Sequence, residues 1–158
     1  MKDYGPHGKV IALSVFLTLL STLLGCRTGP EANSGEDAYR NMAIEAPVGS
    51  FIYDDFAGPE GDATDWRRFE LAKPTEVIVT VVFENEKAEA DVGIYDTYGM
   101  SITEDYKRAA DSARMTLKGV APQGTVFVKV AAGKTRYRSN YTMTIKLGKS
   151  MYVPPRPF

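Results

Sequence analysis

The chain has 158 residues, and its 19 lysines and arginines nearly balance its 20 aspartates and glutamates, so the formal net charge is −1. We do not expect a nucleic-acid partner, because such a partner requires clustered positive charge. The only histidine, His7, and the only cysteine, Cys26, lie near the N-terminus. The rest of the chain therefore lacks imidazole and thiol, which excludes Ser-His-Asp and Cys-His catalysis, the usual zinc and copper ligands and an internal disulfide. We do not expect an enzyme.

The N-terminal segment has the anatomy of a secretory signal peptide. Lys2 and Lys9 precede an unbroken run of apolar and small residues over 10–24. This run is shorter than the about 20 residues that a membrane-spanning helix needs. It ends in Leu-Leu-Gly-Cys at 23–26, which resembles the lipobox of bacterial lipoproteins. The resemblance implies cleavage before Cys26, lipidation of its thiol with palmitate-type acyl chains, and anchoring in the cell envelope.

The residue after the cysteine bears on the membrane to which the protein is sorted. Arg27 stands where an aspartate would imply retention in the inner membrane. Resemblance to well-studied Gram-negative lipoproteins therefore implies the outer membrane, with the domain facing the periplasm or the cell surface.

Composition divides the chain into four parts. We predict a signal peptide over 1–25, a lipidated cysteine with a flexible tether over 26–48, a β domain over 49–148 and a proline-rich tail over 149–158. The tether is rich in glycine, proline, serine and acidic residues. Within it, a short helix is expected over 37–45, which Pro47 would end.

The tail contains Pro154, Pro155 and Pro157 and cannot continue a β-ladder. We favour a frayed terminus. The alternative is a docking peptide, which Tyr152 and Phe158 would serve.

From residue 51 onward, short runs of β-branched and aromatic residues alternate with turn residues, which is typical of an antiparallel β domain. The run 75–84 is apolar on both faces and predicts a central strand. A clear period of two over 126–131 and 141–147 predicts strands with one buried and one wetted face. The polar stretch 105–112 predicts a loop. The sequence thus predicts an all-β fold with about eight strands, over 51–54, 67–72, 75–84, 91–96, 100–104, 113–118, 126–131 and 141–147.

Four fragments of this domain resemble parts of the bacterial pre-peptidase C-terminal domain. They are Asp-Trp-Arg-Arg-Phe at 65–69, Asp-Val-Gly-Ile-Tyr-Asp at 91–96 with Gly99, Gly-Thr-Val-Phe-Val-Lys-Val at 124–130 and Asn-Tyr-Thr-Met at 140–143. The resemblance extends over about 51–147. It implies an antiparallel β-sandwich of jelly-roll type that acts as a non-catalytic accessory module. Some members of that family bind calcium or extracellular polymers such as collagen.

Acidic residues gather around a glycine-rich loop. Carboxylates in such a loop could supply several of the about six to eight oxygens that calcium needs, although the spacing does not match an EF-hand. Solvated turn carboxylates are the simpler interpretation. A glycosidase acid and base pair would need a separation that the sequence does not fix, and we do not predict one. No cofactor is therefore predicted, and the candidates for a calcium site are Asp54, Asp55, Glu60, Asp62 and Asp65.

Aromatic and cationic residues, which are enriched at binding hot spots, occur together in two places. The alternative is that the tryptophan packs at the edge of the sandwich while the arginines lie over it. The same two interpretations, partner contact or packing within the domain, remain open for Tyr95, Tyr98 and Tyr106. The candidates for contact with a partner are Trp66, Arg67, Arg68, Arg136, Tyr137 and Arg138.

Together these features predict a lipid-anchored binding module of the cell envelope, serving as an accessory or assembly subunit. The expected partners are the membrane, through the lipid on Cys26, and an envelope protein or a polysaccharide. The alternative is a stand-alone surface domain that binds polysaccharide or calcium.

Overall fold

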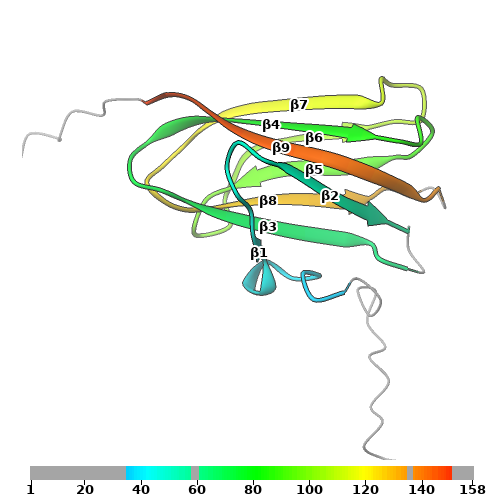
Figure 1. Cartoon of the computed structure of the whole chain (residues 1–158), viewed down its shortest axis with the longest axis horizontal. Helices are drawn as coiled ribbons and strands as arrows, with labels where there is room; N and C mark the ends of the chain where they lie inside the picture. The colour runs from blue at the N-terminus through cyan, green and yellow to red at the C-terminus, as the bar shows by residue number, and fades with distance from the viewer. Residues whose placement is uncertain (1–34, 58–60, 135–136, 151–158) are drawn as a thin grey trace, which may run out of the picture.

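The computed structural model describes residues 35–57, 61–134 and 137–150 (Figure 1). These residues form nine strands, preceded by one short 3₁₀ helix, η1 (Arg40–Met42). The strands are β1 (Ile44–Glu45), β2 (Phe51–Phe56), β3 (Thr64–Leu71), β4 (Thr75–Phe83), β5 (Ala90–Tyr95), β6 (Ser101–Lys107), β7 (Arg114–Ala121), β8 (Gly124–Ala132) and β9 (Ser139–Ser150).

The strands form two sheets, which Figure 1 shows as stacked layers. One sheet has the order β1-β3-β8-β5-β6 and the other β2-β9-β4-β7. The antiparallel pairs are nested: β2 pairs with β9, β3 with β8, β4 with β7 and β5 with β6. A long hairpin folded across itself gives this arrangement, which is the jelly roll. The predicted antiparallel β-sandwich is confirmed, and β1 adds a ninth strand that runs parallel to β3.

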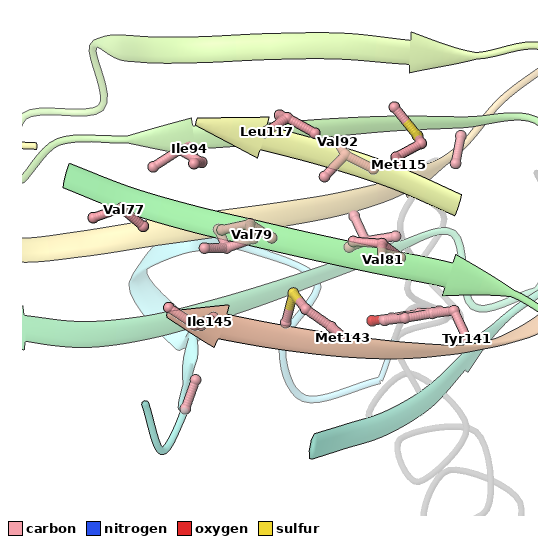
Figure 2. Close-up of a cluster of buried hydrophobic side chains, with 14 of the residues drawn as sticks. Val77, Val79, Val81, Val92, Ile94, Met115, Leu117, Tyr141, Met143 and Ile145 are labelled. Carbon is pink, nitrogen blue, oxygen red and sulfur yellow. The ribbon is translucent and has the colours of Figure 1, made fainter. Parts of the chain in front are cut away.

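The core lies between the two sheets and is built from alternate residues of each strand (Figure 2). In β4 the inward residues Val77, Val79 and Val81 are fully buried, and Val128 of β8 is buried opposite them. Val79 lies in register with Leu117 of β7 and Ile145 of β9, so three adjacent strands contribute to one apolar layer. Burial of about 25 cal/mol per Å² of apolar surface drives this packing.

The central position predicted for the run 75–84 is confirmed, because β4 lies between β9 and β7. Its second apolar face is not covered, however. Val82 is 41% exposed on the outer side of the sheet. The apolar residues on that side therefore belong to the surface of the protein.

The loop predicted over 105–112 is wrong at its start, because β6 continues to Lys107. The Lys107 side chain is 1% exposed, and its ammonium group donates hydrogen bonds to the backbone oxygens of Glu86, Ala88 and Arg108 at 2.6, 2.8 and 3.2 Å. Because these oxygens accept hydrogen bonds from the buried ammonium group, the polar residues 105–107 can form the end of β6.

The segment 37–46, which we placed in the flexible tether, packs on the sandwich. The helix expected over 37–45 is wrong, since only the three residues of η1 are helical and β1 follows directly. Ile44 of β1 lies in register with Arg67 of β3. Ala38, Ala43 and Ala46 are buried, because small side chains let this segment lie close to the sheet.

The predicted signal peptide, Cys26 and residues 151–158 of the predicted tail lie outside the described residues, whereas the first two residues of that tail, Lys149 and Ser150, belong to β9. In the part of the chain that the structure describes, no helix is long and apolar enough to cross a membrane.

Candidate functional site

A buried group of carboxylates surrounds one arginine between β2, β3 and the N-terminal segment. The alternation of β3 turns Asp65 and Arg67 inward, where they are 1% and 7% exposed. The Arg67 guanidinium donates hydrogen bonds to the carboxylates of Asp37 and Asp54. Arg67 therefore ties the segment before β1 to two strands of the sandwich, one in each sheet.

The second pair of this group joins the two sheets. The Tyr141 hydroxyl of β9 donates a hydrogen bond of 2.6 Å to Oδ2 of Asp65, while Oδ1 of Asp65 has no hydrogen-bond partner among the described residues. Burial raises the pKa of Asp65 to about 8, and burial with nearby carboxylates raises the pKa of Asp62 to about 6. Burial and the neighbouring Asp65 also raise the pKa of Tyr141. The raised pKa favours the protonated, neutral form of Asp65, which limits the negative charge in the interior.

The structure separates the five acidic residues that the sequence grouped. Asp54 and Asp65 lie in the buried group. Asp62 lies nearby, and its pKa is raised by the charge of Asp54 and lowered by that of Arg67. Asp55 follows the opposite alternation and is exposed, and Glu60 lies outside the described residues. Sequence reasoning missed Asp37, which is 30 residues from its partner. An arginine at an inward position of an alternating strand is the signal that requires such an acid.

One carboxylate oxygen each from Asp37, Asp54 and Asp65 lie within 4.8 Å of one another, a spacing suited to a metal ion. Calcium needs about six to eight oxygens, however, and two of these carboxylates already bond to Arg67. A cation at this position would have to displace the guanidinium. In the described arrangement Arg67 supplies the positive charge.

A cluster of aromatic rings lies on the outer face of the five-stranded sheet. It consists of Trp66 of β3, Tyr95 of β5 and Phe127 of β8, and we call it the aromatic surface. The Trp66 ring lies 5.2 Å from that of Tyr95 and 6.5 Å from that of Phe127, measured between centroids. Lys129 places its ammonium 6.0 Å from the Trp66 centroid, and Arg40 of η1 lies 5.3 Å from that of Phe127. Cations over rings at these distances hold the cluster in place.

Gly93 allows the close packing of this cluster. A Cβ atom at Gly93 would lie 2.7 Å from the Tyr95 ring, so Tyr95 lies over the bare backbone and is only 8% exposed. Burial, together with a hydrogen bond to the Glu104 carboxylate, raises the pKa of the Tyr95 hydroxyl. Tyr95 is therefore the buried member of the aromatic surface, against which the Trp66 ring packs.

Exposed apolar residues occur on the turn after β5, which lies beside this cluster, and on the N-terminal segment. Gly99 of the turn has φ +84° and contacts the Arg40 side chain. Its neighbours Tyr98 and Met100 are 86% and 68% exposed. The exposed apolar residues of the N-terminal segment are Tyr39, Met42 and Ile44.

The structure places the three predicted binding candidates of β3 in different environments. Trp66 is partly buried in the aromatic surface, and Arg68 is exposed on the same side of β3. Arg67 was wrong as a surface contact, because it is paired in the interior.

The second predicted set, Arg136, Tyr137 and Arg138, is not part of the aromatic surface. Tyr137 is 46% exposed and Arg138 is exposed, while Arg136 lies outside the described residues. They follow the end of β8, whereas the turn that carries Tyr98 lies beside the start of β8, where Thr97 bonds to the Thr125 carbonyl. The turn that carries Tyr98 and the residues Tyr137 and Arg138 thus lie at opposite ends of β8, whereas Trp66 pairs with Lys129 nearer the end that leads to Tyr137.

Comparison with solved structures finds the same architecture in bacterial domains. One is the pre-peptidase C-terminal domain of collagenase from Bacillus anthracis, with a TM-score of 0.56, 17% identity, and coverage of 66% of this chain and 94% of that one. Another is CorA, a surface-associated copper-binding protein of Methylomicrobium album BG8, with a TM-score of 0.51, 7% identity, and coverage of 67% and 98%. No family model and no curated protein matches the chain. The chain thus has a fold like that of the pre-peptidase C-terminal domain.

Proposed function

We propose that this protein is a non-catalytic binding module of the bacterial cell envelope, anchored by lipid on Cys26, and that the aromatic surface with its exposed rim contacts a partner protein. The observation that carries the proposal is the exposure of Tyr98 and Met100 beside the packed rings of Trp66, Tyr95 and Phe127. Aromatic residues, methionine and arginine are enriched in protein interfaces. Exposed apolar groups that lie together mark interaction sites.

Arg40 supports the same surface. One of its guanidinium nitrogens, Nη1, is buried and has no hydrogen-bond acceptor among the described residues. This nitrogen lies against Gly99 of the turn and is closed to a partner, so Arg40 acts by connecting the turn that carries Tyr98 to the Phe127 ring, which lies 5.3 Å from the guanidinium carbon.

The partner contact is tested with the full chain in the cells that produce it. We expect crosslinking and capture of the wild-type chain to recover one stoichiometric envelope protein, and the double variant Tyr98→Ser and Met100→Ser to recover at least about tenfold less of it. Both residues are exposed, so the melting temperature should not change. Equal recovery by the variant and the wild type would refute the proposed surface.

The anchor is tested separately by metabolic labelling with an alkyne fatty acid. The wild-type chain should take up the label and stay with membranes, whereas Cys26→Ser should take up none and leave them, because a stable anchor depends on the acyl chains. Labelling of the Cys26→Ser chain would contradict lipidation at this residue.

The alternative, a calcium-binding module, is supported by the 4.8 Å grouping of oxygens from Asp37, Asp54 and Asp65. It requires that added calcium raise the melting temperature of the domain and that a chelator lower it. Unchanged melting in both conditions would leave Arg67 as the cation of this group and would reject the calcium alternative.

A further inference from the structure

The outer face of the four-stranded sheet, on the opposite side of the sandwich from the aromatic surface, carries an ordered array of side chains. Strand register places these side chains in three rows across β2, β9, β4 and β7. The middle row contains Phe51, Thr144, Thr80 and Thr116, and the hydroxyls of Thr80 and Thr116 lie 3.3 Å apart. The two flanking rows are Tyr53, Thr142, Val82 and Arg114 on one side, and Lys146, Ile78 and Lys118 on the other.

This array has a net positive charge although the whole chain is nearly neutral. Its three rows contain the cations Arg114, Lys118 and Lys146 and no carboxylate. The nearest acidic residues along the strands are one row further out. They are Asp55 and Glu84 beyond one flanking row and Glu76 beyond the other, and Glu84 accepts a hydrogen bond from Asn140 at 2.7 Å. Arg114, Lys118 and Lys146 form no ion pair among the described residues, so their charges are open to a ligand.

A groove of about 420 Å³ runs over this array and is lined by residues of β2, β9, β4 and β7, among them Phe51, Arg114 and Lys146. Phe51 is 67% exposed and Tyr53 75% exposed, and their ring centroids are 6.4 Å apart with the planes inclined by 32°. Phe51 lines the groove and the tilted ring of Tyr53 lies next to it, so the two exposed rings form an apolar patch at one side of the groove. The remaining lining offers hydroxyl groups and cations.

We propose that this groove binds an acidic polysaccharide, a glycan chain whose sugars carry carboxylate groups. The exposed rings of Phe51 and Tyr53 would pack against the apolar faces of sugar rings, and the threonine hydroxyls would bond to sugar hydroxyls. Arg114 and Lys146 would pair with the carboxylates, for which the planar guanidinium is well suited. This surface and its ligand are distinct from the protein contact proposed above.

The composition of the array favours a glycan over a second protein partner. Lysine is depleted in protein interfaces, and charged residues are depleted from their buried centres, whereas here Lys146 lies within the groove. The apolar part is limited to two rings, Val82 and the half-buried Ile78, which is less than a protein-binding core usually offers. A polar, cationic groove with an aromatic patch matches an extended anionic sugar chain.

The test is retention of the full chain in affinity gels that contain polygalacturonate, with neutral mannan as the comparison. We expect retention by polygalacturonate that falls as salt rises, and at least about tenfold weaker retention for the double variant Arg114→Ala and Lys146→Ala. Lys73→Ala with Lys87→Ala removes the same charge from exposed positions outside the array and should leave retention unchanged. Phe51→Ala with Tyr53→Ala should weaken retention without changing the melting temperature.

Absence of retention on polygalacturonate would overturn the proposal. So would equal retention on mannan or on single-stranded DNA, equal loss in the charge-matched control pair, or unchanged retention after the aromatic residues are removed. These outcomes leave the protein contact unaffected, because Tyr98 and Met100 lie outside the array.

Discussion

Replacement of Arg67 by methionine is expected to destabilise the domain by about 3–5 kcal/mol, the cost of leaving buried carboxylates without their cation. Asp37 and Asp54 would both lose the guanidinium that bonds to them. For a domain of this size, such a loss lowers the melting temperature by more than about 10 °C. Thermal and urea unfolding of the full chain measure the effect.

Arg68→Met is the matched control for this prediction. It is the same substitution one position along β3, but Arg68 is exposed and has no ion pair among the described residues. It should change the free energy of unfolding by no more than about 0.5 kcal/mol. Similar unfolding curves for the two variants would show that Arg67 is not the centre of a buried network.

Asp65→Asn is expected to remove a pH dependence of stability. Because the pKa of Asp65 is raised from 3.8 to about 8 in the folded protein, the folded state keeps a proton that the unfolded chain releases. Stability from this source is complete below about pH 4 and is lost as the pH rises towards 8. With about 1.4 kcal/mol for each pKa unit, this shift of about four units corresponds to a loss of up to about 6 kcal/mol.

The asparagine variant cannot ionise, and its amide oxygen can still accept from the Tyr141 hydroxyl. It should therefore match the wild type within about 1 kcal/mol near pH 4 and exceed its stability at pH 8. Asp55→Asn, at an exposed position beside the buried Asp54, should follow the wild-type pH curve. A constant difference between Asp65→Asn and the wild type across this range would contradict a protonated Asp65.

The sequence was sufficient for the fold because the apolar alternation is strong in β4, β8 and β9, where each inward valine or isoleucine is buried as predicted. It failed where polar residues are inside. Lys107 is buried only because three backbone oxygens converge on it, and those belong to the β4–β5 connection and to the neighbouring residue. Such long-range partners are not visible in a local pattern.

The candidate sites show the same limit. Trp66 could be identified as part of an aromatic group because tryptophan is rare and lies in a conspicuous motif, but its neighbours Tyr95 and Phe127 come from strands that meet only in the folded sheet. Arg67 and Arg68 look equivalent in the sequence, and strand alternation sends one to the interior and the other to solvent. The groove over β2, β9, β4 and β7 was not predicted, because its rows depend on the register of four strands.

The central claim, a binding module that contacts its partner through the rim of the aromatic surface, is tested most directly by site-specific photo-crosslinking in living cells. A photoreactive residue at position 98 should give one discrete adduct with an envelope protein, and the same residue at position 73, an exposed site in the β3–β4 turn, should give none. The account predicts that the adduct at 98 disappears when Met100 is replaced by serine. No adduct at 98, or the same adducts at 98 and 73, would contradict it.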